Sequence, residues 1–291
     1  MKVPSSIDQI WECERGDGPL LVTALHDSHL IRSEAEPYLR VSSDERLREE
    51  DPYTRRWTGF ATSRVVVTRS RFEVDLNRPE ERALYRTPQE AWGLRVWREE
   101  TPENVLEGSL AQRRLFYREM EGLLSDLVSR HPIVVLIDLH TYNHRREGPA
   151  APEADPAWNP QVDIGTSAEN RPQFVPLIER FMGDLRKFDF LGARLDVREN
   201  VKFPLGPFGE WAQGKFPGRV CALGVEVKKF FMDEWTGEAD ETLLEVIGEA
   251  LASTVPGLME EVLRIPQFLP NPGQPPAAPR VAQRQRDSHD S

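Results

Sequence analysis

Four nearly continuous apolar runs constrain the fold of this chain more than any other feature of the sequence. They read LLVTAL (20–25), RVVVTR (64–69), PIVVLIDLH (132–140) and RVCALGVEV (219–227), and GARLDVREN (192–200) is a weaker fifth. Runs without polar alternation are typical of strands that are covered on both faces. Helical patterns separate them, over 107–131, 171–188 and 240–263. Strands that alternate with helices predict an α/β fold with a mixed or mostly parallel sheet.

The composition is that of an ordinary globular chain. Of its 291 residues, 39% are hydrophobic and 29% are charged, and no apolar run approaches the roughly 20 residues that a membrane helix requires. The N-terminal sequence MKVPSSIDQIWECERGDG lacks the apolar segment of an export signal. We therefore expect a cytoplasmic protein that has no membrane partner.

The last part of the sequence differs in composition from the rest. From Ile265 onward the sequence is rich in proline, glutamine and charge, so it has too little apolar surface to offset the entropy lost on ordering. We expect one folded domain over 1–264 and a disordered tail over 265–291.

The formal charge of −11 argues against a nucleic-acid partner. Two cysteines without metal-type spacing, Cys13 and Cys221, predict free thiols.

Two of the predicted strands end in histidine. His26 follows the run 20–25, and His140 ends the run 132–140. In open α/β sheets, ligands bind outside the carboxyl ends of the strands, so the two imidazoles can meet although 114 residues separate them. A catalytic zinc ion usually has three protein ligands and a water molecule. Asp138 points to the same side as His140 and can orient its ring.

The sequence HDSH places a second histidine, His29, three residues after His26. In a continued strand the two rings would point to opposite faces. Both can reach one ion only if the chain turns after His26, which Asp27 and Ser28 favour through bonds to nearby backbone amides. Either both histidines bind the metal, or His29 is incidental.

Three further positions are candidates for chemistry. Asn77 and Arg78 follow an alternating, strand-like pattern in SRFEVDLNRP (70–79), where a guanidinium fork can hold a carboxylate; the alternative is a surface pair with Glu80 or Glu81. Glu226 interrupts an apolar strand, and a buried carboxylate is costly unless it has a role or a partner. It is either a general base toward metal-bound water or a structural ion pair with Lys228 or an arginine.

Several of these motifs together resemble the N-formylglutamate amidohydrolase family. They are ALHDSHLIR, EEDPYT, RSRFEVDLNRP, LIDLHTYNHRR and LGVEVKKFFMDEWTG, in this order from about Leu20 to about Leu263. The family is similar in turn to the zinc carboxypeptidases. The resemblance implies a three-layer α/β/α sandwich around a mixed, mostly parallel sheet, and a zinc hydrolase that cleaves the amide bond of an N-formyl or N-acyl amino acid.

The resemblance also implies roles for single residues. His26 and His140 match the family's histidines, Arg78 matches the holder of the substrate carboxylate, and Glu226 matches the carboxypeptidase-type general base. The carboxypeptidases have a glutamate where this chain has His29. We therefore expect one zinc ion per chain, held by His26, His29 and His140, with Asp51 as the rival for the third place.

Two functions from different classes remain open at this stage. The first is metal-dependent amide hydrolysis of a small acylated amino acid or short peptide, with Asn77, Arg78 and Arg145 as substrate-binding residues. Arg71 and Arg146 are alternatives to Arg145 as the group that stabilises the oxyanion. The second is a catalytically inert protein that binds or senses an acylated amino acid.

Overall fold

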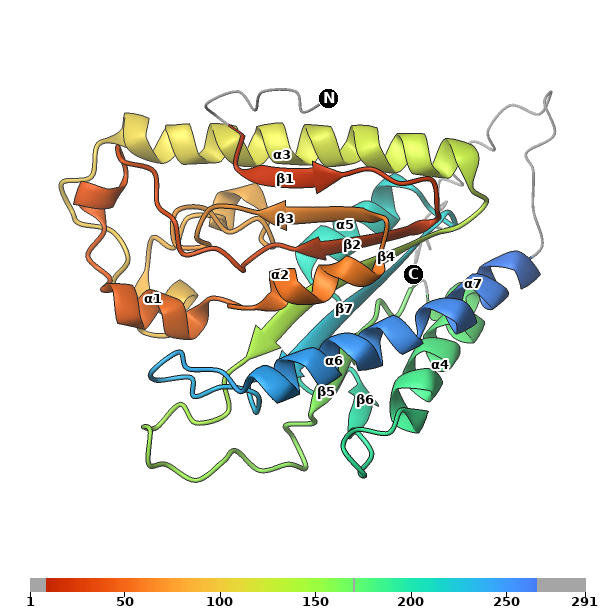
Figure 1. Ribbon diagram of the computed structural model, residues 1–291. Helices are drawn as coiled ribbons and strands as arrows, with labels where there is room; N and C mark the ends of the chain where they lie inside the picture. The colour runs from red at the N-terminus through yellow and green to blue at the C-terminus, as the bar shows by residue number, and fades with distance from the viewer. Residues whose placement is uncertain (1–8, 170, 266–291) are drawn as a thin grey trace, which may run out of the picture.

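The protein is built around one mixed sheet of seven strands in the order β1-β3-β2-β4-β7-β5-β6 (Figure 1). The computed structural model describes residues 9–169 and 171–265. Four strand pairs are parallel and two, β1·β3 and β5·β7, are antiparallel. The strands are β1 Trp11–Glu14, β2 Leu20–Ala24, β3 Ser63–Val67, β4 Val134–Tyr142, β5 Val162–Gly165, β6 Val197–Glu199 and β7 Val220–Lys228.

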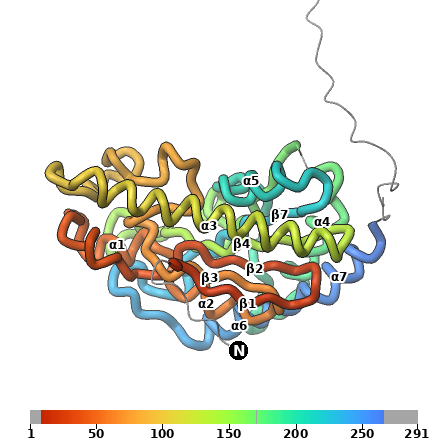
Figure 2. Tube along the Cα trace, turned by 90° about the horizontal axis from the view of Figure 1, so that it is seen from above, coloured from red at the N-terminus to blue at the C-terminus, as the bar shows by residue number. Residues whose placement is uncertain are grey.

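Helices cover both faces of this sheet. They are α1 Ser43–Glu49, α2 Thr54–Trp57, α3 Glu103–Arg130, α4 Arg171–Lys187, α5 Pro207–Lys215, α6 Glu241–Ser253 and α7 Val255–Arg264. Apolar residues of α3 and α5 pack on one face, and those of α2, α4, α6 and α7 pack on the other. Figure 2 shows α3 and α5 on the opposite side of the sheet from α2 and α6. The predicted α/β fold with helical layers on both faces is confirmed.

The apolar runs correspond to strands because their side chains are buried on both faces. In β4 every residue is buried, and in β7 only Glu226 is partly exposed. The weak fifth run contributes the short strand β6. The predicted helix over 240–263 is two helices, since α6 ends at Ser253 and α7 has a proline in its first turn.

One local prediction was wrong, and two strands were not predicted. Residues 70–76 form turns and irregular backbone rather than a strand, so Asn77 and Arg78 lie in a loop. Strand β5, Val162–Gly165, lies outside every apolar run that was predicted to form a strand. Strand β1, which pairs with β3 at the edge of the sheet, was not predicted either. The predicted tail over 265–291 lies outside the described residues except for Ile265, the residue that follows α7.

Helices α6 and α7 together form one apolar stretch, Glu241–Arg264, that is long enough to cross a membrane by length and composition alone. The buried residues of this stretch, such as Leu244, Ile247 and Leu258, belong to the core cluster on the sheet. Core helices of soluble proteins pass the same test, so the stretch is weak evidence for a membrane span.

The topology explains where polar side chains gather. β2, β4 and β7 are neighbours and run parallel, so their carboxyl ends meet at one edge of the sheet. His26 follows β2, His140 lies near the end of β4, and Glu226 lies directly opposite His140 in β7. The fold therefore brings the strand-end residues to one place, as expected for an α/β sheet.

Candidate metal centre

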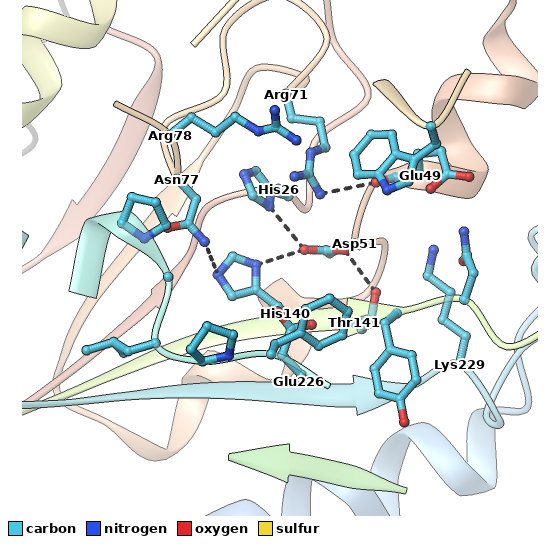
Figure 3. Close-up of a pocket in the computed structure, with 18 of the residues that line it drawn as sticks. His26, Glu49, Asp51, Arg71, Asn77, Arg78, His140, Thr141, Glu226 and Lys229 are labelled. Carbon is cyan, nitrogen blue, oxygen red and sulfur yellow. Dashed lines mark hydrogen bonds and ion pairs between the residues drawn. The ribbon is translucent and has the colours of Figure 1, made fainter. Parts of the chain in front are cut away.

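His26, Asp51 and His140 form a buried cluster at this edge of the sheet (Figure 3). One nitrogen of each imidazole and one oxygen of the carboxylate all lie within 4.8 Å of one another. The Nδ1 atoms of His26 and His140 lie 3.2 and 2.9 Å from the same Oδ2 atom of Asp51. Two imidazoles and one carboxylate are a common ligand set of catalytic zinc. These three residues could therefore hold a metal ion.

Asp51 reaches the histidines because helix α1 ends just before it. The helix begins with a capping box, in which the Ser42 hydroxyl accepts from the Glu45 amide and the Glu45 carboxylate accepts from the Ser42 amide. After the helix, the Asp51 amide donates to the carbonyl of His26 at 2.9 Å. The Thr141 hydroxyl then donates to Asp51 Oδ1 at 3.1 Å. Oδ2 is left facing the two rings.

A second carboxylate contacts the far nitrogen of each ring. His26 Nε2 lies 2.8 Å from Asp75 Oδ1, and His140 Nε2 lies 2.8 Å from Asp138 Oδ2. The Thr23 hydroxyl holds Asp138 in turn, at 2.5 Å. A carboxylate that accepts the Nε2 proton leaves Nδ1 free as a metal ligand and fixes the orientation of the ring. The arrangement fits a divalent cation at the Nδ1 atoms.

The electrostatics of the cluster favour a cation. Burial alone would raise the pKa of Asp51, but hydrogen bonds from His140 and His26 hold it well below its usual range. Burial would likewise lower the pKa of His140, but Asp138 and Asp51 raise it well above its usual range. Asp138 and Asp51 thus stabilise positive charge at His140, and a bound metal ion would supply that charge in place of a proton.

A cavity of about 330 Å³ opens beside the cluster. Glu226 lines it, and among the described residues its carboxylate has neither a hydrogen bond nor an ion pair, so the alternative of a pair with Lys228 is not observed. Burial raises the pKa of Glu226 to about 8, while the charge of His140 acts in the opposite direction. A carboxyl group of this pKa next to a metal site can accept and return a proton near neutral pH.

Asn77 and Arg78 line the same cavity. Arg78 lies over the ring of Tyr85, 4.7 Å from its centroid, and its Nε is 3.5 Å from Asp75 Oδ2. Its Nη1 atom is buried without a hydrogen-bond partner in the described part of the chain. The amide oxygen of Asn77 accepts from the Phe208 amide at 3.0 Å, at the start of α5. A buried donor without a partner is a cost that a bound carboxylate would remove.

Two of the expected site residues lie elsewhere. His29 is partly exposed, and its ring nitrogens contact Glu50 at 2.6 Å and Ser43 at 2.8 Å, so the structure groups Asp51 rather than His29 with the two histidines. Arg145 pairs with Glu153 at 3.0 Å and lines a different cavity. Arg71 and Arg146, the alternatives to Arg145, do line the metal cavity.

Three charged residues of this site were not among the candidates predicted from the sequence. Asp75 contacts His26 from the irregular segment before Asn77, and 49 residues separate it from that histidine, so no spacing in the sequence links the two. Glu49 lines the cavity and makes a two-bond ion pair with Arg146, with both distances 3.0 Å. Lys229 is buried in the cavity wall, and no sequence motif singles it out, since it lies beside a second lysine.

The family model described as N-formylglutamate amidohydrolase matches residues 18–230 of this chain. This range includes every cavity residue named above. The chain belongs to the N-formylglutamate amidohydrolase family. The predicted family and the predicted class of enzyme, an amidohydrolase, are thus confirmed. No curated protein matches the sequence.

Solved structures agree with the family at the level of the fold. The crystal structure of N-formylglutamate amidohydrolase from Ralstonia eutropha JMP134 has a TM-score of 0.63 and 15% identity, and the match covers 87% of this chain and 98% of that one. A gene product of Agrobacterium tumefaciens has a TM-score of 0.51 and 18% identity, with 84% and 96% covered. At these identities the likeness concerns the arrangement of the sheet and helices.

Proposed function

We propose that this amidohydrolase is a zinc-dependent enzyme that cleaves the amide bond of N-formylglutamate or a similar N-acyl amino acid. The observation that carries the proposal is the buried group of His26, Asp51 and His140 at a cavity that also holds the unpaired carboxylate of Glu226. A zinc ion bound there would polarise the acyl carbonyl and make a water molecule acidic.

The residues of the chain would divide the remaining work. Glu226 accepts the proton of the attacking water and passes it to the leaving amine, so that formate and a free amino acid are the products. Arg78 holds the substrate carboxylate with the buried Nη1 donor that has no other described partner. Arg71 and Arg146 are positioned to stabilise negative charge in the same cavity.

The proposed partner is a small molecule, and the proposed compartment is the cytoplasm. The cavity, about 330 Å³, suits a small acylated amino acid or a short peptide end, with no nucleic acid or membrane surface involved. Cys13 and Cys221 are free thiols, which agrees with a reducing cytoplasm.

The test is formate release from N-formylglutamate, measured for the purified protein, after chelation, and after zinc is returned. We expect activity that the chelator abolishes and zinc restores, with about one zinc per chain at full activity. Activity that survives complete removal of metal would refute the zinc mechanism. Saturable binding of N-formylglutamate without any turnover of a panel of N-acyl amino acids would instead support the inert binding protein.

A further inference from the structure

Lys229 is a buried cation of the metal cavity that the proposed mechanism does not use. It directly follows β7, its side chain is among the most deeply buried in the described protein, and it lines the cavity beside Asp51 and Glu226. Burying an ammonium group is costly unless polar groups compensate it. Among the described residues no carboxylate pairs with it. Other polar groups must therefore compensate its buried charge.

The ammonium group binds the end of helix α1. Nζ donates to the carbonyl of Arg48 at 2.6 Å and to the carbonyl of Glu50 at 2.8 Å. The last carbonyls of a helix have no partner within the helix and carry partial negative charge, so a cation there is favourable. The carbonyl between them, that of Glu49, accepts from Arg71 at 3.3 Å. Two cavity cations thus hold three consecutive carbonyls immediately before Asp51.

Lys229 also joins the segments that carry the other site residues. Its backbone amide donates to the carbonyl of Tyr142 at 3.0 Å, two residues after His140 at the end of β4. Its own strand, β7, carries Glu226. In Figure 3, Lys229 and Glu49 lie on the same side of Asp51. One residue therefore ties the Asp51 segment to both strands that bear His140 and Glu226.

We propose that Lys229 is a positioning residue that fixes the segment Arg48–Asp51 so that the Asp51 carboxylate faces His26 and His140. This inference rests on the proposed metal site and assigns a residue to its construction. Burial lowers the pKa of Lys229 to about 8, and the nearby Asp51 and Glu49 carboxylates oppose that shift. The two hydrogen bonds from Nζ to the carbonyls of Arg48 and Glu50 are strongest when the lysine is charged.

The experiment compares zinc affinity in Lys229→Met and Lys228→Met. Methionine keeps much of the side-chain length and removes the charge and the donors. Lys228 is the matched control, because it is the preceding residue, is also buried, and points to the other face of β7, where Nζ contacts the carbonyl of Asn159 at 3.4 Å. Zinc would be titrated into metal-free protein against a chelator of known affinity, with thermal unfolding of the metal-free proteins measured alongside.

We expect Lys229→Met to weaken zinc binding by roughly 10–100-fold, as removal of other outer-shell partners does, and Lys228→Met to bind like the wild type. Lys229→Gln, which retains one donor group, should have a zinc affinity between those of the wild type and Lys229→Met. Equal zinc affinity in the two methionine variants would overturn the proposal. So would a failure of both Lys229 variants to fold, because the lysine would then support the whole fold. A wild-type protein that binds no zinc would instead refute the proposed function.

Discussion

At the scale of single residues, the candidate metal site is defined by the atoms that surround Oδ2 of Asp51. Both Nδ1 atoms point to Oδ2 of Asp51, and each Nε2 atom is held by a further carboxylate. With a metal ion bound in place of the proton, this pattern would present two neutral imidazoles and one anion to the cation. His29 has the opposite environment, since Glu50 and Ser43 already occupy both of its ring nitrogens.

Asp51→Ala should therefore remove zinc binding, whereas His29→Ala should retain it. We expect the first variant to lose more than the roughly 10–100-fold of affinity that an outer partner contributes, because a direct ligand is gone. His29→Ala should bind within a few-fold of the wild type. Zinc titration against a chelator measures both. Loss of zinc in His29→Ala with normal binding in Asp51→Ala would restore the original assignment of His29.

Glu226→Gln should bind zinc normally and lose most of its turnover. The amide has nearly the same shape as the carboxylate but cannot accept the proton of the attacking water, and general-base catalysis is worth about 10²–10⁴-fold. The measurements are kcat on N-formylglutamate and the zinc content of the same sample. A variant with nearly normal kcat would show that Glu226 is structural.

Arg78→Ala should act on substrate binding rather than on chemistry. A hydrogen bond between charged groups contributes about 1.5–3 kcal/mol, so we expect KM to rise by roughly 10–100-fold for substrates with a free α-carboxylate. The corresponding α-carboxamides should show little change. Equal losses on both kinds of substrate would mean that Arg78 supports the fold through Asp75 and Tyr85.

At the scale of elements, buried strands were easier to predict than loops. β2, β4 and β7 are apolar runs whose ends carry the site, so His26, His140 and Glu226 could be found from the sequence. Asp51 and Lys229 could not be selected in the same way, because a helix end and a strand end bring them together through backbone carbonyls. The turns over 70–76 also alternate in hydrophobicity, which is why they resembled a strand.

Helix α5 offers a test of how an element positions a site residue. Gly206 precedes the helix, and a Cβ atom there would lie 2.6 Å from Asn77 Nδ2 and 3.0 Å from its Cγ. Gly206→Ala should displace the Asn77 side chain and cost about 1–3 kcal/mol of stability, as overpacking usually does. Steady-state kinetics should show a higher KM, and thermal unfolding should show the loss of stability.

Gly214→Ala is the control within the same helix. Among the described residues, no atom other than those of its chain neighbours and of the helix's own backbone lies within 4 Å of a Cβ placed there. Alanine should therefore be neutral or stabilise the helix by up to about 1 kcal/mol. Its KM should equal that of the wild type. If both alanine variants behave alike, the close approach of Gly206 to Asn77 has no functional consequence.

At the scale of the whole molecule, the order of strands and helices along the chain determines the fold class. The pairing of the strands then determines their order and direction in the sheet. Alternating apolar runs and helical patterns were sufficient to predict a covered, mostly parallel sheet. They could not predict that β5 runs antiparallel to β7, because four buried residues after a long polar segment carry little signal. The site did not depend on that detail, since it lies at β2, β4 and β7.

The fold and its cavity are built from only part of the chain. The described sheet and both of its large core clusters are built from residues between Ile10 and Ile265, and the cavity lies between His26 and Lys229. The sequence after Ile265 is rich in proline and glutamine and has little apolar surface to bury. Deletion of 266–291 should therefore leave the melting temperature, zinc content and kcat/KM unchanged within error. A drop of several degrees in the melting temperature of the truncated protein would show that the C-terminal residues pack on the domain.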